Sequence, residues 1–260
     1  MVNSMWLKES NEQFQAAWSL YARCSKAGEV VDLDGLCIAN SRLPWYLMNA
    51  ALLTAPVSSQ AHLAAIAGKA CTYFANEQRP WFFAGNHSWL GEGATETLSR
   101  LGLAKAFTAT GMFTERLAPP AHPLPEVETQ RIDDEASRRA LADLNATVYE
   151  LSPDWVRAAV ESQRLWETPL YGFNAYVSGQ VVSTAFAVAQ KGVLYVAYVA
   201  TAREYRRQGL AELVMRRCIE QASQETGIHR TALHSTADGH PGYIRMGYKP
   251  VDEFTLFVPQ

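Results

Sequence analysis

The stretch Arg203-Glu-Tyr-Arg-Arg-Gln-Gly-Leu-Ala-Glu-Leu-Val-Met215 places three arginines around one glycine and then becomes amphipathic. After the glycine, apolar residues recur every three to four positions, at Leu210, Ala211, Val214, Met215, Cys218, Ile219 and Ala222. Gly227 supplies a stop signal. The sequence therefore predicts a helix that begins after Gly209 and ends before Gly227.

The start of this predicted helix is suited to bind an anion. Its first N–H groups lack partners within the helix, and the helix dipole adds positive potential. Gly209 has no β-carbon, so the backbone can approach a ligand closely. Arg206 and Arg207 would be unfavourable beside a helix N-terminus unless an anion lies there. We therefore expect a phosphate-binding turn, with a solvated basic helix start as the alternative. The Walker pattern and the G-x-G-x-x-G pattern are both absent from the sequence.

The rest of the C-terminal half alternates between predicted helices and strands. Spaced apolar residues predict a helix at 133–149, and Ser152-Pro153-Asp154 opens another one. Three β-branched and aromatic runs predict antiparallel strands joined by tight turns, at 170–177, 181–189 and 193–200. Further elements are expected beyond the helix: a strand at 229–234, a short helix that Thr236 can cap and that ends near 246, and a last pair of strands from 247 to about 258.

A proline-rich segment divides the chain. Four prolines within Ala118–Pro125 support neither a helix nor a central strand, so we predict domains at 1–118 and 127–260 with a linker at 119–126. The N-terminal half repeats the order of elements, with a helix at 11–26, strands at 36–40 and 46–54, a helix at 59–76 and a strand at 81–84. Its end, 101–113, parallels 246–258, which indicates an internal duplication.

Composition and charge narrow the classes of function. With 48% hydrophobic residues and a formal charge of -3, the chain is typical of a soluble globular protein without a nucleic-acid signal. The first ten residues lack the signal-peptide pattern, and no apolar run approaches the roughly 18 residues of a membrane span. We expect a cytoplasmic protein with no membrane partner. The cysteines are far apart, so we expect buried free thiols and no metal site: Cys24, Cys37, Cys71 and Cys218.

Two motifs resemble the GNAT acyltransferase superfamily. The turn Arg206-Arg-Gln-Gly-Leu-Ala211 resembles the family loop R/Q-x-x-G-x-G/A, after a strand and a Val199–Tyr205 run of the family type. Downstream, Leu233–Tyr248 resembles a second family segment at the expected separation. One departure is Arg203, where proline is common. The resemblance implies an α/β (α+β) fold of tandem GNAT modules, each with a mixed, mostly antiparallel sheet flanked by helices.

The resemblance also implies a site for acetyl-coenzyme A as co-substrate in the C-terminal module. The resemblance implies that the pantetheine arm lies between a splayed pair of strands and pairs with their backbone. By position, the residues that would make this contact are Val199 and Thr201. The diphosphate would lie on the amides at one helix start, with Arg206 or Arg207 adding charge: Gln208, Gly209, Leu210 and Ala211. Thr236 is the matching position for a polar contact from the next helix, although helix capping alone would also explain it.

The implied reaction is direct attack of an amine on the thioester. Tyr243 matches the family's tyrosine acid, which would protonate the departing thiolate, and its alternative is a core aromatic. The family's glutamate base has no counterpart in Leu194–Tyr198. The candidates for the base are Glu150, Asp154, His234 or a bound water, and the residues do not choose among them.

The N-terminal copy has no glycine turn and no arginine where its helix begins, at Ala55-Pro-Val-Ser-Ser-Gln-Ala-His-Leu63, so we expect a degenerate module that does not bind coenzyme A. The segment Thr147–Trp155 lacks the acidic cluster expected for a polyamine or a basic peptide. We therefore expect a monomeric or homodimeric N-acetyltransferase that acts on a small amine or amino acid. The alternatives are a protein or peptide N-acetyltransferase and a non-catalytic module that senses an acyl-coenzyme A.

Overall fold

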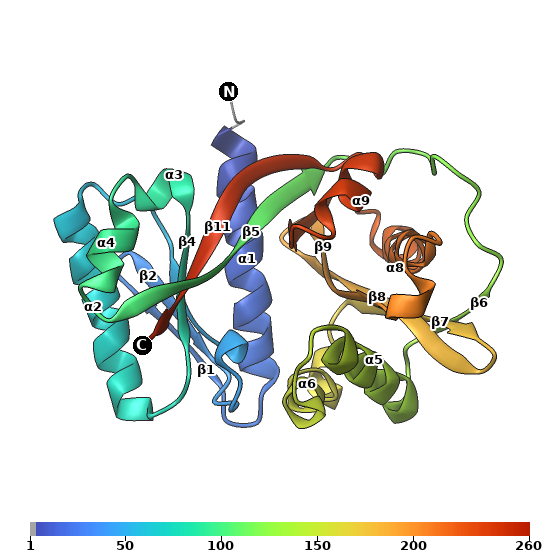
Figure 1. The fold of residues 1–260 in the computed structure, drawn as a ribbon, viewed down its shortest axis with the longest axis horizontal. Helices are drawn as coiled ribbons and strands as arrows, with labels where there is room; N and C mark the ends of the chain where they lie inside the picture. Colours follow the sequence, from blue (N-terminus) through green and yellow to red (C-terminus); the bar gives the residue numbers. More distant parts are fainter. Residues whose placement is uncertain (1–3) are drawn as a thin grey trace. The chain divides into compact units, whose positions relative to one another are not determined.

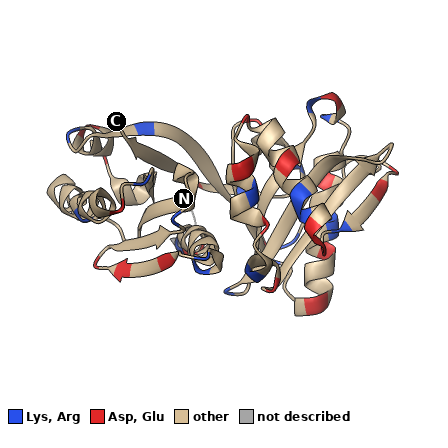
Figure 2. Ribbon diagram, turned by 90° about the horizontal axis from the view of Figure 1, so that it is seen from below, with Lys and Arg blue, Asp and Glu red and all other residues tan. Residues whose placement is uncertain are grey.

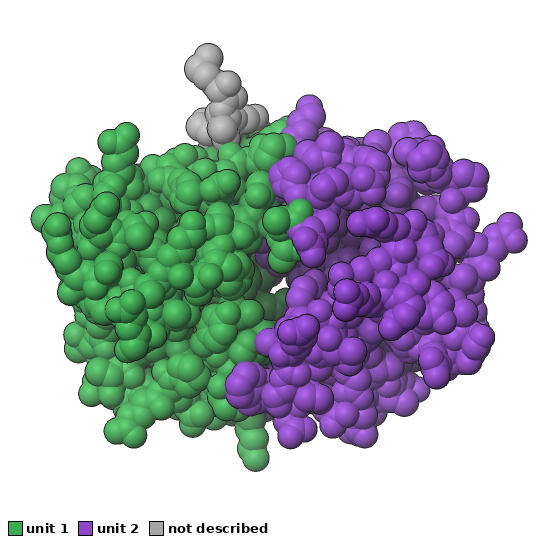
Figure 3. Space-filling model, in the orientation of Figure 1, with its two compact units in different colours: residues 1–111, 235–237, 250–260 green, residues 112–234, 238–249 purple. Residues whose placement is uncertain are grey.

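A computed structural model describes residues 4–260, and the chain forms two compact units (Figures 1 and 3). Unit 1 comprises the residues up to Gly111 with 235–237 and 250–260, and unit 2 comprises 112–234 and 238–249. These units differ from the predicted ranges 1–118 and 127–260, because the last strand of the chain lies in unit 1. The predicted linker, 119–126, contains neither a helix nor a strand.

Unit 1 is a sheet with helices. Its helices are α1 (Ser4–Cys24), α2 (Gln60–Glu77), α3 (His87–Leu90) and α4 (Ala94–Ser99). Its strands are β1 (Glu29–Leu33), β2 (Leu36–Asn40), β3 (Asn49–Leu53), β4 (Phe82–Asn86) and most of β5 (Leu103–Thr114) and β11 (Lys249–Pro259). Their order is β1-β2-β3-β4-β11-β5. β3 and β4 are parallel, whereas β11 pairs antiparallel with β4 and buries Phe254 and Leu256 in the core of this unit.

Unit 2 repeats this plan. Its helices are α5 (Glu135–Val148), α6 (Pro153–Val160), α7 (Gln163–Trp166), α8 (Leu210–Thr226) and α9 (His240–Arg245). Its strands β6 (Glu128–Arg131), β7 (Leu170–Val177), β8 (Gln180–Gln190), β9 (Val193–Thr201) and β10 (Thr231–Ser235) have the order β10-β9-β8-β7-β6. Only the β9–β10 pair of these described strands is parallel. α8 and α5 cover opposite faces of this sheet (Figure 1).

The amphipathic pattern after Gly209 explains how α8 is held. Its apolar stripe is buried against β7, β8 and β9, and Leu213, Val214 and Cys218 are among the core residues. Gly209 and Gly227 flank the helix with φ of 81° and 74°, values that suit glycine and strain other residues. The predicted helix is therefore confirmed in both bounds, and its N-terminus is fixed by the core beneath it.

Most of the other predicted elements are confirmed, with four corrections. The helix expected at 11–26 begins at Ser4 and ends at Cys24. The expected pair of strands at 247–258 is one continuous strand, β11. The expected strand at 46–54 begins with a 3-10 turn at Tyr46–Met48 and becomes β3 only from Asn49. β1 and β6 were not predicted, because Glu29–Leu33 and Glu128–Arg131 are short edge strands with many exposed polar residues and no buried alternation. Three cysteines are buried as expected, while Cys71 is partly exposed.

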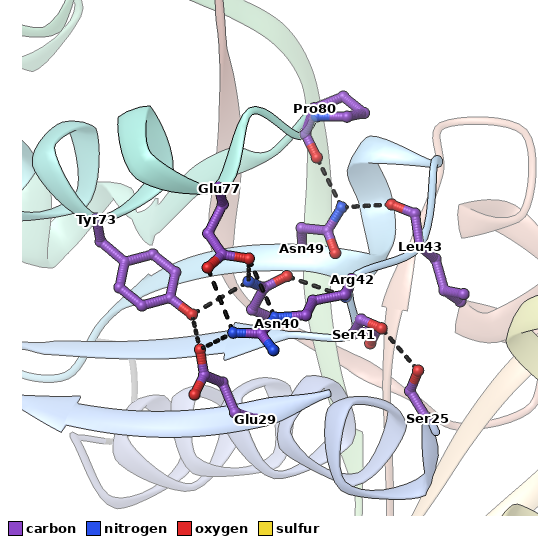
Figure 4. A network of polar contacts seen from close by, with 10 residues as sticks. All are labelled: Ser25, Glu29, Asn40, Ser41, Arg42, Leu43, Asn49, Tyr73, Glu77 and Pro80. Carbon is purple, nitrogen blue, oxygen red and sulfur yellow. Dashed lines mark hydrogen bonds and ion pairs between the residues drawn. The ribbon is translucent and has the colours of Figure 1, made fainter. Parts of the chain in front are cut away.

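A paired polar network stabilises unit 1 near the end of α2 (Figure 4). Arg42 donates to Glu77 at 3.0 Å and to Glu29 at 3.0 Å, so one guanidinium holds two carboxylates. Tyr73 donates to Glu29 and accepts from the buried Asn40, and burial of its hydroxyl together with the Glu29 contact raises its pKa to about 12. These contacts link β1 and β2 to α2, so the role of the network is structural.

Candidate functional site

The β9–β10 pair separates in the middle of β9. The parallel ladder, within the described residues, joins Thr231 to Leu194 and Ala232 to Tyr195, whereas β9 continues to Thr201. The backbone edge of β9 beyond Tyr195 is therefore not covered by β10. This gap is the splayed strand pair that the family resemblance predicts.

A β-bulge marks the beginning of the open edge. The β8–β9 register changes between Phe186, opposite Ala197, and Thr184, opposite Ala200, and Tyr198 has a φ of 53°. Such a conformation is unusual for an aromatic residue and releases its peptide groups from the regular ladder.

The strand alternation then places Val199 and Thr201 at the gap. The N–H of Ala202 donates to Val182 of β8, so the peptide groups one and three residues earlier point away from β8. In the present structure both carbonyls have side-chain donors: Tyr149 Oη lies 2.8 Å from Val199 O, and Arg206 Nε lies 3.4 Å from Thr201 O. Val199 O and Thr201 O thus lie at the open edge of β9, and their contact with a pantetheine arm stays a prediction.

The loop after β9 leads directly into the start of α8. A 3-10 turn at Arg203–Tyr205 is followed by Arg206 in extended conformation and Arg207 with a φ of 62°. No side chain caps the helix start at Gly209, and residues 206–209 are exposed. Gln208 folds back and donates to Glu204 O. The helix start therefore presents its backbone amides without a capping side chain in front of them.

Unit 1 offers a direct comparison at the matching helix start. There Ser59 caps α2 by accepting from the N–H of His62 at 3.1 Å, and the His62 ring accepts from the N–H of Ser58 at 3.2 Å. A side chain thus caps one amide at the start of α2, whereas none caps the start of α8. The anion site predicted at the start of α8 therefore has no side-chain cap in its way, whereas the matching helix start of unit 1 has one.

Tyr243 lies on α9 with its ring 5.9 Å from that of Tyr248, edge to face. It is half-buried and packs against the main core of unit 2. Burial, and then the nearby phenols of Tyr149 and Tyr248, raise the pKa of Tyr243 above its usual value. The hydroxyl therefore stays protonated at neutral pH, as a proton donor requires. The packing fits the core-aromatic alternative equally well, so the role of Tyr243 stays a prediction.

The candidate bases differ in environment. Tyr195 Oη lies 3.0 Å from His234 Nδ1, and burial lowers the pKa of His234 to about 3, so that its ring is neutral at pH 7 and weakly basic. Asp154 is exposed and lies 3.7 Å from Arg157. Glu150 is exposed at the end of α5 with a φ of 54°. Of the three side chains, only His234 lies on a strand that borders the gap.

The depressed pKa of His234 predicts a loss of stability in acid. In the unfolded chain His234 takes up a proton below its usual pKa of about 6.5, whereas in the folded protein it stays neutral down to about pH 3. The contribution of His234 to the free energy of unfolding is therefore fully present above pH 6.5 and is lost as the pH falls toward 3. We expect His234→Gln to reduce this loss between pH 6.5 and 4 by about 3 kcal/mol. Urea unfolding of both proteins at several pH values measures it, and parallel pH profiles would contradict it.

Thr236 does not cap α9, because that helix begins at His240 and its N-cap is Gly239. Thr236 is exposed and belongs by its contacts to unit 1. Its expected coenzyme contact stays a prediction. Sequence reasoning missed Tyr149 and Asn145, two side chains of the α5 region that donate to β9. Their spacing of four residues on a predicted helix was the available signal.

In Figure 2, segments with Lys or Arg and segments with Asp or Glu are interspersed along the ribbon. Among the residues that the structure describes, no group of three or more His, Cys, Asp or Glu side chains is placed to hold a metal ion. None of the helices at 4–260 is long and apolar enough to cross a membrane.

Comparison with solved structures shows which fold this is. A GCN5-related N-acetyltransferase from Kribbella flavida has a TM-score of 0.71 at 20% identity, over 96% of this chain and 95% of that chain. One from Sphaerobacter thermophilus has a TM-score of 0.62 at 14% identity, over 86% and 76%. A tandem GNAT protein from the clavulanic acid biosynthesis pathway has 0.58 at 14% identity, over 96% and 94%. The fold is therefore that of tandem GNAT modules.

The family model for the acetyltransferase (GNAT) family matches residues 138–248. This range contains the splayed strands, the loop before α8 and Tyr243. Residues 138–248 of unit 2 are thus similar to the acetyltransferase (GNAT) family, and this similarity supports acyl transfer as the general class of reaction. A search of the curated proteins found no match.

Proposed function

We propose that unit 2 transfers an acetyl group from acetyl-coenzyme A to the primary amine of a small molecule or amino acid. The observation that carries the proposal is the uncapped start of α8 at the open end of the β9–β10 gap. A diphosphate there accepts hydrogen bonds from the amides of Gln208–Ala211, and Arg206 and Arg207 add charge. The pantetheine arm pairs with the exposed edge of β9 at Val199 and Thr201.

The reaction needs two proton transfers. An alkyl amine has a pKa near 10, so only about one molecule in a thousand is neutral at pH 7. A base or a water must therefore take its proton before the nitrogen attacks the thioester carbonyl. As the new C–N bond forms and the C–S bond breaks, the thiolate of coenzyme A leaves, and Tyr243 is the proposed donor of its proton.

A thiol-release assay tests the proposal. Acetyl-coenzyme A is incubated with the protein and with pools of small amines and amino acids, and free thiol is measured. We expect release above the rate without acceptor for at least one pool, and mass spectrometry then identifies the acetylated amine. Binding of coenzyme A without release for any small amine, combined with release for a lysine peptide, would favour a peptide acceptor. Binding without any release would favour the sensor alternative.

A further inference from the structure

Two side chains from one end of α5 donate hydrogen bonds to consecutive carbonyls of β9. Asn145 Nδ2 lies 3.3 Å from Tyr198 O, and Tyr149 Oη lies 2.8 Å from Val199 O. Consecutive carbonyls of a regular strand point to opposite edges. One helix end reaches both because the bulge at Tyr198, with its φ of 53°, turns the backbone at this point.

The two contacts differ in how firmly they are held. Asn145 is 2% exposed and also donates to Leu141 O within α5, so it is a fixed part of the packing. Tyr149 is the C-cap residue of α5 and is 47% exposed. Its ring can therefore leave Val199 by side-chain rotation, without opening the core of unit 2.

The Tyr149 hydroxyl occupies the edge that the proposed function assigns to the pantetheine arm. Val199 O points into the gap, so a donor bonded to it lies in the gap. Burial of this hydroxyl raises the pKa of Tyr149, whereas the charge of Arg206 lowers it and that of Asp238 raises it. A substrate arm that pairs with Val199 meets this phenol first.

We infer that Tyr149 is a displaceable cap on the pantetheine edge of β9: its phenol holds Val199 O in the unliganded protein and must swing away when the coenzyme arm enters. The inference rests on the proposed function. When only a fraction of the protein is in the form that can bind, the apparent affinity for the ligand is the intrinsic affinity multiplied by that fraction. Removing the hydroxyl populates the open form, so the cap lowers affinity for the arm and not for the nucleotide.

Calorimetric titration of the whole protein with two probes tests this. Coenzyme A contains the pantetheine arm, and adenosine 3′,5′-bisphosphate lacks it. One neutral hydrogen bond is modest in net strength, so Tyr149→Phe is expected to bind coenzyme A about two- to tenfold more tightly than the wild type. Its affinity for the bisphosphate should stay unchanged. Tyr176→Phe is the control, because it removes the same group from β7 in unit 2 without touching β9 or the loop.

Each outcome decides between the two ideas. Tighter binding of coenzyme A alone supports the cap. Unchanged or weaker binding of coenzyme A by Tyr149→Phe, or an equal gain for both probes, overturns the cap and leaves the proposed function intact. If the wild type binds neither probe, the proposed function itself is overturned, and the cap with it. Tyr149→Phe retains its ring at a site that is 47% exposed, so we expect it to fold like the wild type.

Discussion

Gly209→Ala is expected to weaken coenzyme A binding about a hundredfold, or about 2.7 kcal/mol, which matches the loss of one or two hydrogen bonds to a charged group. At a φ of 81°, alanine is strained, and its β-carbon would lie 3.2 Å from Pro125 Cδ. Either the turn or Pro125 must shift. Because the diphosphate would be held by backbone amides, such a shift removes their alignment and no side chain can replace them. Calorimetric titration with coenzyme A measures the effect.

The same helix supplies the control for this variant. Gly227 ends α8 with a φ of 74°, and a β-carbon there would meet nothing within 4 Å. Gly227→Ala therefore carries a similar backbone strain, about 1 kcal/mol, at the opposite end from the proposed site. We expect both variants to lose comparable stability, and only Gly209→Ala to lose coenzyme A binding. Equal affinities of the two variants for coenzyme A would contradict the proposal that the diphosphate binds at this turn.

The second large effect concerns Tyr243. Tyr243→Phe is expected to lower the turnover number about a hundredfold, the range of general acid catalysis, while coenzyme A binding is unchanged. The reason is that the departing thiolate loses its proton donor, whereas the ring and its packing against Tyr248 remain. Steady-state kinetics with the amine found by thiol release, together with titration of coenzyme A, separate turnover from binding.

Tyr248→Phe distinguishes a catalytic phenol from a core phenol. The Tyr248 hydroxyl is buried and accepts from Thr231 Oγ1 at 2.8 Å, so its removal is expected to cost about 1 kcal/mol of stability and no turnover. If Tyr243→Phe behaves like Tyr248→Phe, with lower stability and full turnover, Tyr243 is a core aromatic and the acid lies elsewhere.

The raised pKa of Tyr243 adds a prediction for the pH dependence of the reaction. An acid must be protonated to act, and a pKa above the usual value of about 10 keeps this phenol protonated throughout the neutral and mildly alkaline range. We therefore expect no decline of the turnover number between pH 7 and 9.5 from this group. A fall in turnover with an apparent pKa well below 10 that disappears in Tyr243→Phe would keep Tyr243 as the acid and contradict its raised pKa.

Local chemistry was enough to predict α8 and its turn. A glycine at the helix start, arginines before it and an apolar stripe after it act within a few residues, so the sequence contains all the information needed. Local patterns were also enough to predict α5, α6 and the strands β7, β8 and β9 of unit 2. The degenerate helix start of unit 1 was predicted from a missing glycine, and the structure adds the side chains of Ser58, Ser59 and His62 that close it.

The sequence by itself determined where the helices and most strands form, that the order of elements repeats, and which turn to propose as the anion site. Only the tertiary structure decided that 250–260 complete the sheet of unit 1, that β9 bulges at Tyr198, and that Tyr149 and Asn145 reach its carbonyls. Helix periodicity and caps are set by neighbours in the chain. Strand partners, bulges and side chains that lie 50 or more residues from their acceptors depend on packing between distant segments, which no local pattern records.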